Sequence, residues 1–387
     1  LDENVICLTG APFTTFVFCL AIGKPPETEG EHSYGQKKIE QQAHLCFLLW
    51  MAMDYYQVPA PCVLVACVRE VAGKLFLRED VKDRPVCLVS IIGEERTGKS
   101  FLLNYLMRRL NKLDCSDQGW MGGEDEDLRG FECKPGTNSI TKGVFIWNKP
   151  FLMDTEQGKI AIFLVDTEGC NSLEREKGIS TQLSALSILL SSYMILSIAS
   201  KINRTDLEFL EMFLDVAQKV GEVLNLDPIQ HLDILVRDWD TSKTHGKEAG
   251  MKYLEEIQKK MQTNKSTYQS FMKTQLSKAH CFLLPNPGKE IASSSTGHLK
   301  DMDEAFRHSL VDYFGSALQS LPTSGRCDMN GSILTGSQLF DQIKLFAKTI
   351  EKYSVRITTP LQMSNAFWNM KLREDKVQEF KSFIHEQ

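Results

Sequence analysis

The sequence lacks the features that mark several common protein classes. None of its 11 cysteines are spaced as Cys-x-x-Cys, which excludes the usual zinc finger or RING module within these residues. There is no internal repeat or low-complexity tract, and 42% hydrophobic with 24% charged residues is not the composition of a disordered or fibrous chain. A basic excess is also missing, since 44 basic side chains stand against 50 acidic ones. We therefore expect no nucleic-acid partner bound through bulk charge.

Only one segment near the N-terminus approaches the length of a membrane span. Residues 5–22 carry no charge, but polar residues and a proline interrupt them and two acidic residues precede them. We expect a buried or poorly ordered N-terminal piece, with a membrane or signal segment as the alternative. Residues 23–44 are polar, contain a Pro-Pro pair and are typical of a linker. The odd cysteine count and the lack of a secretory leader favour reduced thiols in a cytosolic protein.

From about residue 62, short apolar runs alternate with stretches of helical period. The runs that predict strands are 62–68, 86–92, 160–165, 192–199, 232–236 and 281–284. One of the helical stretches opens with Thr205-Asp206-Leu207-Glu208, which predicts a capping box. Strands and helices in this alternation predict an α/β fold with a mostly parallel sheet covered on both faces.

After residue 300 the strand-like runs stop and three helical stripes follow. They lie at about 302–314, 339–350 and 363–380. With 387 residues, the chain is long enough for two or three domains. We predict an N-terminal segment of uncertain status at 1–61, an α/β domain at 62–320, and a linker with the beginning of a helical middle domain at 321–387. Because the chain begins with leucine and its last helix has no downstream partner, we expect a longer natural protein.

The strongest local signal is the phosphate-loop pattern GxxxxGK[ST] at residues 93–100, which read GEERTGKS. It follows a predicted strand and opens a predicted helix, as the pattern requires. Gly93 and Gly98 allow a tight turn close to a phosphate, and backbone amides at the helix N-terminus favour an anion. Lys99 would neutralise the β- and γ-phosphates, and the Ser100 hydroxyl would ligate Mg²⁺.

Three weaker signals have the right order for a nucleotide site. Asp166-Thr167-Glu168-Gly169 follows a predicted strand, where the aspartate can hold the metal through water and the Gly169 amide can meet the γ-phosphate. In 137–143, TNSITKG, a threonine could complete the Mg²⁺ shell, although a polar turn fits equally well. Arg237-Asp238 ends a predicted strand, and a carboxylate accepts hydrogen bonds from guanine N1 and N2, which adenine does not offer. A surface ion pair is the alternative.

Together these motifs resemble the large-G-domain GTPases of the dynamin superfamily, which include atlastins and guanylate-binding proteins. RTGKS, TKG, DTEG and VRDW occur in this order, and the resemblance covers roughly 62–387. The stretches 119–147, 205–239 and 281–288 are most similar to atlastin-like members that carry an N-terminal RING finger. The RING cysteines and the C-terminal membrane hairpin of such proteins are missing here, so ubiquitin ligase activity cannot be carried over.

The resemblance implies a role for each matching residue. Arg96 matches an internal arginine finger, which would stabilise charge on the transferring phosphoryl group. Ser139 and Thr141 match switch I, with Thr141 on Mg²⁺ and Ser139 near the attacking water, and Asp166 and Glu168 match switch II. The nucleotide-binding set that follows is Gly93, Glu95, Arg96, Thr97, Gly98, Lys99, Ser100, Phe101, Gly169, Arg237, Asp238 and Pro285, with Ser100, Thr141 and Asp166 toward the metal.

The resemblance implies hydrolysis of GTP to GDP with Mg²⁺, a homodimer through the G domain, and membrane association of the full-length protein. The expected location is cytoplasmic, on the cytosolic face of endosome or endoplasmic reticulum membranes. Two rivals remain open, a nucleotide-gated interaction module with negligible turnover and an ATPase, of which Asp238 disfavours the second. His280 beside Cys281 is interpreted as a packed strand residue and not as a catalytic pair.

Overall fold

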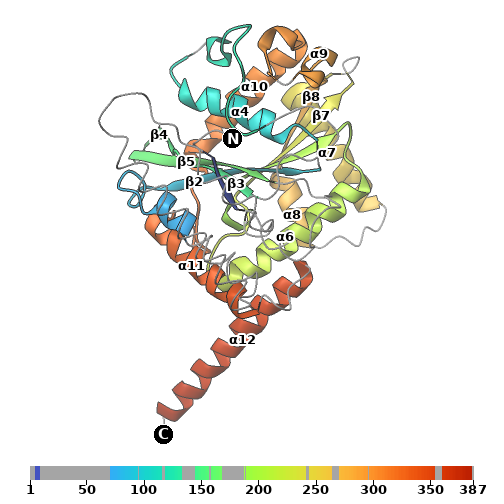
Figure 1. The fold of residues 1–387 in the computed structure, drawn as a ribbon. Coiled ribbons are helices and arrows are strands. Elements are labelled where there is room, and N and C mark those ends of the chain that lie inside the picture. The colour runs from blue at the N-terminus through green and yellow to red at the C-terminus, as the bar shows by residue number, and fades with distance from the viewer. Residues whose placement is uncertain are drawn as a thin grey trace, which may run out of the picture.

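The computed structural model describes residues 5–8, 70–94, 96–115, 118–132, 144–156, 158–167, 187, 189–240, 244–263, 270–294, 296–353 and 360–385. Eight strands of this part of the chain form one sheet with helices on both faces (Figure 1). The strands are β1 Val5–Leu8, β2 Val86–Gly93, β3 Val144–Trp147, β4 Phe151–Thr155, β5 Gly158–Thr167, β6 Tyr193–Ala199, β7 His231–Trp239 and β8 His280–Pro285. Their order is β1-β3-β5-β2-β6-β7-β8, and β4 pairs with β5.

The core of the sheet is parallel, as the alternating pattern predicts. β5, β2, β6, β7 and β8 run in one direction, β3 and β4 pair antiparallel with β5, and β1 pairs antiparallel with β3. The five parallel strands were all predicted, and the predicted strand at 62–68 lies outside the described residues. β3 and β4 were not predicted, because β3 has only four residues and β4 alternates between buried and exposed positions. Neither presents the long apolar run of a buried parallel strand. β1, which lies in the uncharged segment 5–22 and pairs with β3, was not predicted as a strand either.

Helices cover both faces of this sheet. They are α4 Lys99–Asn111, α6 Arg204–Leu224, α7 Gly246–Thr263, α8 Ser270–Lys278, α9 Lys289–Ser293, α10 Glu304–Ser320, α11 Gly336–Tyr353 and α12 Pro360–His385, with short 3₁₀ turns at Gln118–Met121, Leu299–Asp301 and Leu321–Thr323. A further helical segment begins the main body at 70–76. α4 and α10 lie on one face, whereas α6 and α11 lie on the other (Figure 1).

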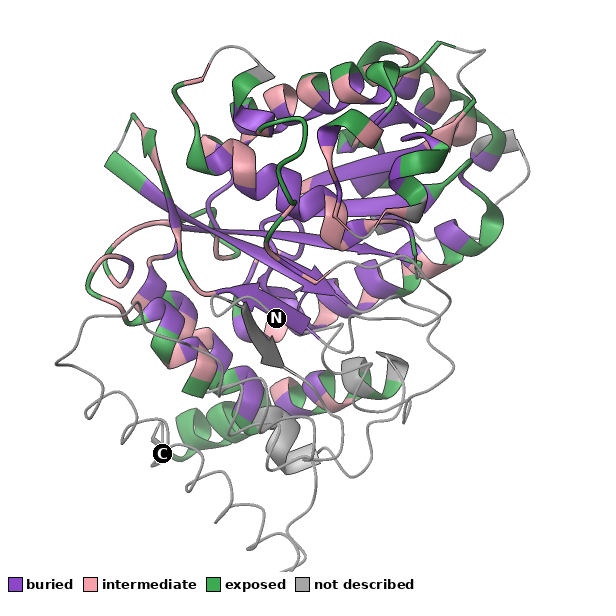
Figure 2. Cartoon of the chain, turned by 45° about the horizontal axis from the view of Figure 1, so that its top comes forward, coloured by how far each residue is buried: buried purple, intermediate pink, exposed green. Residues whose placement is uncertain are grey.

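The residues of β2 alternate between the two hydrophobic cores. Cys87, Val89 and Ile91 pack with α4 and α10, whereas Val86 and Leu88 pack with α6 and α11. Successive side chains of a strand point to opposite faces, so a strand between two helical layers must be apolar at every position. All eight positions of β2 are buried, and the central strands are purple along most of their length in Figure 2.

The last two helices extend the fold beyond the sheet. α11 packs into the core on the α6 face, and Phe346 of α11 stacks on Phe367 of α12 with ring centroids 5.4 Å apart. The rest of α12 projects from the body to the C-terminus (Figure 1). Its outer part is exposed, including Phe380 and Phe383. No helix in the described ranges has the length and apolar character needed to cross a membrane.

The capping box of α6 differs from the expected one. Asn203 is the N-cap, its side chain accepts a bond from the Asp206 amide at 3.0 Å, and Asp206 accepts one from the Asn203 amide at 2.9 Å. The predicted box, which began at Thr205, was wrong by two residues. Thr205 already lies inside the helix and is exposed. The sequence offers two overlapping patterns of cap spacing here, and burial of Asp206 selects the earlier one.

Replacement of Asn203 should measure this cap directly. Asn203→Ala removes the acceptor for one helix amide and should lower the free energy of unfolding by about 0.5–2 kcal/mol in urea denaturation. Thr205→Ala is the matched control and should leave stability nearly unchanged. Equal losses in the two variants would contradict the cap at Asn203.

Candidate active site

The predicted site residues come from the carboxyl ends of neighbouring parallel strands. Parallel strands end at the same edge of a sheet, which is where ligands bind in such folds. Asp166 near the end of β5 is in register with Ile91 of β2, and Gly93 of β2 is in register with Ser197 of β6. Arg237 near the end of β7 is in register with the last residue of β6. The structure therefore brings the phosphate loop, Asp166 and the Arg237-Asp238 pair to one edge.

The two glycines of the phosphate loop are required by its close contacts. Gly93 has φ of 145°, and a Cβ there would collide with the Ser197 carbonyl oxygen of β6. Gly98 is the N-cap of α4 with φ of 67°, a left-handed conformation in which a Cβ would meet the Arg237 guanidinium. Thr97 closes the turn, since its Oγ1 donates to the Glu94 carbonyl at 3.0 Å.

Lys99 lies inside the phosphate loop. The residue is 6% exposed, and its Nζ donates to the Glu94 carbonyl oxygen at 2.7 Å. Because α4 begins at Lys99, its first amides face the loop, and the helix dipole adds positive potential there. A buried ammonium beside helix amides is an environment suited to a phosphate.

A pair of oxygen ligands lies beside the lysine. Ser100 Oγ donates to Asp166 Oδ2 at 2.6 Å, and Asp166 is buried. Next to it, Thr167 Oγ1 donates to the Ile91 carbonyl at 2.7 Å, which fixes the ends of β5 and β2 together. A hydroxyl and a carboxylate are hard oxygen donors, and Mg²⁺ in nucleotide sites takes few protein ligands of this kind with water and phosphate. These two residues fit the expected metal.

Arg237 contacts the phosphate loop. Its guanidinium is buried, donates to the Thr97 carbonyl oxygen and lies where a side chain at position 98 would be. Burial lowers the pKa of Arg237, and neighbouring Asp238 offsets part of that effect. Arg237, one residue of the expected base-reading pair, therefore links the phosphate loop to β7. Its contact with a base stays a prediction.

Asp238 lies outward from Arg237. It has φ of 55°, and the pairing of β7 with β8 shifts register between Val236 and Trp239. This irregularity leaves Asp238 half-buried at the end of the sheet. Asn286 holds the carboxylate, since its Nδ2 donates to Asp238 Oδ1 at 3.1 Å, while its own Oδ1 accepts from the Gly288 amide at 3.0 Å.

Pro285 was among the expected nucleotide-binding residues, but the contact of Asn286 with Asp238 was not predicted. Pro285 is opposite Trp239 in the ladder, so the start of this loop lies directly beside Asp238. An asparagine between two prolines was a usable signal, because prolines leave few backbone donors and make a side-chain amide the natural link.

Other predicted residues are placed differently. Arg96 is exposed, with φ of 63°, which is uncommon for a residue with a Cβ and is a known mark of functional loops. Phe101 is half-buried in α4, its ring 5.1 Å from that of Tyr105, so it packs the helix beneath the loop. The predicted residues that lie outside the described part of the chain are Glu95, Ser139, Thr141, Glu168 and Gly169.

The phosphate loop at the edge of a mostly parallel, helix-covered sheet defines a P-loop α/β domain of the large G-domain type. Residues 68–322 match the family described as guanylate-binding protein, N-terminal domain. The chain belongs to this family.

Individual relatives agree with the family. RING finger protein 112 of Homo sapiens is 34% identical over 319 residues, which cover 79% of this chain and 49% of that protein. Atlastin-2 of Homo sapiens is 30% identical over 290 residues, covering 72% and 49%. Atlastin of Drosophila melanogaster is 33% identical over 250 residues, covering 62% and 46%. The expected atlastin-like class is confirmed, and the chain spans about half the length of these curated relatives.

The contact between Gly98 and Arg237 can be tested by mutation. Gly98→Ala should cost about 1–2 kcal/mol for the left-handed backbone alone, and more for the collision with the guanidinium. In the Gly98→Ala background, Arg237→Ala should be less harmful than in the wild type, with a coupling of about 0.5–3 kcal/mol in urea denaturation.

The control is Gly123→Ala, because a Cβ at that loop glycine meets its nearest atom at an ordinary 3.8 Å. Additive effects of the two substitutions would show that Arg237 does not pack against the loop.

Proposed function

We propose that this chain binds GTP with Mg²⁺ and hydrolyses it to GDP and phosphate. The observation that carries the proposal is the arrangement along one sheet edge. Lys99 and the Ser100–Asp166 oxygen pair lie at the phosphate end, and Asp238, held by Asn286, lies at the base end on β7, two strands from β2. The description of the matched family as guanylate-binding supports a guanine nucleotide as the ligand.

The phosphate end would bind and orient the triphosphate. Lys99 exchanges its bond to the Glu94 carbonyl for phosphate oxygens, and the first amides of α4 donate to them. Mg²⁺, when bound, neutralises charge on the β- and γ-phosphates. Ser100 and Asp166 are the described residues that would hold it, Asp166 through water. Ser139, Thr141 and Glu168 remain our assignments for positioning the water and completing the metal shell.

Hydrolysis would proceed by in-line attack of water on the γ-phosphate. Arg96 is well situated to assist, because it extends from the phosphate loop itself and is exposed. A guanidinium brought to the transferring group stabilises the charge that develops there, in the manner of an arginine finger supplied in cis. The exposed side chain needs a partner surface to hold it, which is the physical reason for proposing a second copy of the chain.

The base end would select guanine. The Asp238 carboxylate accepts from guanine N1 and N2, while Asn286 fixes its orientation through Oδ1. The loop that follows Pro285 lies beside this carboxylate and would wall the base. Adenine presents an acceptor at N1, so it would leave the carboxylate facing a lone pair.

At the level of the whole protein we propose a nucleotide-dependent homodimer through the G domain. The family resemblance supports coupling of this dimer to tethering or remodelling of endosomal or endoplasmic reticulum membranes on their cytosolic face. The division into a G domain at 62–320 and the beginning of a helical middle domain at 321–387 is part of the same proposal.

Asp238→Asn should change base preference rather than merely weaken binding. The amide loses an acceptor for guanine N2 and gains a donor that suits the C2 carbonyl of xanthine. We expect GTP affinity to fall by about 1–3 kcal/mol, or roughly 5- to 150-fold, with XTP becoming the better ligand. Competition against a fluorescent GDP analogue measures both.

Asp240→Asn is the matched control, since Asp240 is exposed and lies two residues further on. If Asp238→Asn keeps the wild-type preference for GTP over XTP, this carboxylate does not read the base.

Arg96→Ala should abolish hydrolysis while leaving GTP affinity almost intact. An arginine finger contributes about 10³- to 10⁵-fold to turnover, so single-turnover hydrolysis should fall by at least about 10³-fold. Wild-type activity per molecule should rise with protein concentration because pairing holds Arg96 in place, and the variant should lose that rise.

Arg204→Ala, at another exposed arginine, is the control. A wild type that binds GTP without turnover would refute hydrolysis and favour a nucleotide-gated interaction module. Hydrolysis that is independent of concentration would refute the pairing alone.

A further inference from the structure

A compact group of ligand-type side chains lies at the opposite edge of the sheet from the nucleotide site. His231 and Asp233 are two residues apart near the start of β7, so both point to the α10 face, and Asp233 is in register with His280 at the start of β8. Asp238 follows Asp233 by five positions along β7, which corresponds to about 17 Å at the usual rise per residue of a strand. The cluster and the nucleotide site are therefore distinct.

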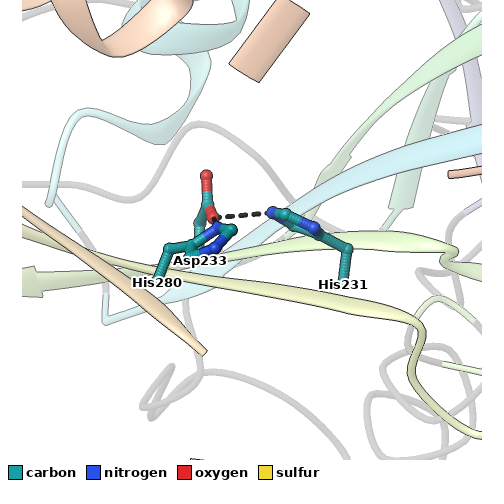
Figure 3. A group of neighbouring side chains, drawn as sticks. All are labelled: His231, Asp233 and His280. Carbon is teal, nitrogen blue, oxygen red and sulfur yellow. Dashed lines mark hydrogen bonds and ion pairs between the residues drawn. The ribbon is translucent and has the colours of Figure 1, made fainter. Parts of the chain in front are cut away.

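The two imidazoles converge on one carboxylate oxygen of Asp233 (Figure 3). His231 Nε2 is 2.8 Å and His280 Nδ1 is 3.5 Å from Asp233 Oδ1. The ligand atoms of all three residues lie within 4.8 Å of one another. Ligand atoms about 2.0–2.2 Å from a common metal ion are separated by distances of this order, so small rotations of the rings would place all three on one ion.

The second oxygen of the carboxylate is held by two phenols. Tyr193 Oη donates to Asp233 Oδ2 at 2.5 Å, and Tyr313 Oη of α10 donates to the same oxygen at 3.2 Å. The Tyr193 ring also stacks on the His231 ring, with centroids 4.0 Å apart and planes at 19°. Metal ligands in proteins are oriented by outer contacts of this kind, which leave one carboxylate oxygen directed at the metal.

The buried carboxylate has no permanent positive partner in the described part of the chain. Asp233 is 6% exposed, and its only ion-pair partners there are the two histidines. A buried carboxylate that no lysine or arginine in the described residues neutralises is an environment that a divalent cation would stabilise.

We propose that His231, Asp233 and His280 form a binding site for a divalent transition metal, with Zn²⁺ as the favoured ion. Two imidazoles, which are borderline ligands, together with one carboxylate suit zinc, cobalt and nickel, whereas Mg²⁺ and Ca²⁺ prefer sites made of oxygen ligands alone. His231 would bind through Nε2, His280 through Nδ1 and Asp233 through Oδ1. The His280 side chain is 43% exposed, so the ion can enter from that side and keep water in its remaining position.

Such an ion would join elements that are distant in the sequence. It would cross-link the first residues of β7 and β8 directly, and through Tyr193 and Tyr313 it would reach β6 and α10. Its binding would add to the stability of the folded state, because the unfolded chain does not present the three ligands together.

The test is metal binding by the intact, chelator-stripped chain. Titration of Zn²⁺ by calorimetry should show one ion per chain, together with a rise in thermal midpoint. His280→Ala should lower the affinity at least about 100-fold, and Tyr313→Phe, which removes only an outer contact, by about 10- to 100-fold. The half-exposed His280 side chain can be removed without opening a core cavity, and retained GDP binding with an unchanged circular dichroism spectrum checks the fold.

His298→Ala is the matched control. His298 Nε2 is also 2.8 Å from a carboxylate oxygen, that of Asp127, but this pair belongs to no described group of three ligands. This variant should bind Zn²⁺ as the wild type does. Substitution with Co²⁺ reports the ligands, since the proposed set gives visible bands without sulfur-to-cobalt charge transfer in the near ultraviolet.

Two results would overturn the assignment. The first is Zn²⁺ affinity in the wild type no greater than in His280→Ala, in which case the cluster is a hydrogen-bonded network only. The second is a cobalt–thiolate charge-transfer band, which would place the ion on cysteine instead.

Discussion

The buried guanidinium of Arg237 connects the two halves of the proposed nucleotide site. It extends from β7, donates to the Thr97 carbonyl and occupies the space beside Gly98 that any larger residue would need. Because Asp238 is the next residue, the phosphate loop and the proposed base-reading carboxylate cannot move independently of each other. Gly98, the left-handed N-cap of α4, lies against this guanidinium, and Lys99 follows it as the first residue of the helix.

β7 connects the proposed nucleotide site with the proposed metal site. Its residues at 231, 233, 235 and 237 share the face toward α4 and α10, while Leu232, Ile234 and Val236 pack in the core with α6, α7 and α8. One strand thus carries histidine and aspartate at its amino end, an apolar middle, and the arginine at its carboxyl end. A ligand at either end would stabilise the same strand.

A second buried arginine joins the sheet to the helical C-terminal region. Arg326 donates to the Asp227 carbonyl at 2.5 Å, to Gln230 Oε1 at 2.8 Å and to the Leu189 carbonyl at 2.7 Å. Burial lowers its pKa to about 10. These acceptors lie just before β6 and β7, so the segment leading to α11 is held by the same layer that carries the nucleotide-binding ends.

The sequence alone determined the class of fold and the phosphate loop. Short apolar runs that alternate with helical stretches favour strands buried on both faces, and GxxxxGK[ST] between a strand and a helix is typical of a phosphate loop. These patterns did not predict β1, β3 and β4, and they placed the cap of α6 two residues late. Only the tertiary structure decided that Arg237 faces the phosphate loop, that Asn286 orients Asp238, and that His280 meets His231 and Asp233. Such contacts depend on strand register and on a bulge, because one residue of shift moves every side chain of a strand to the opposite face. Strands that are apolar on both faces do not show from their own sequence which register they take.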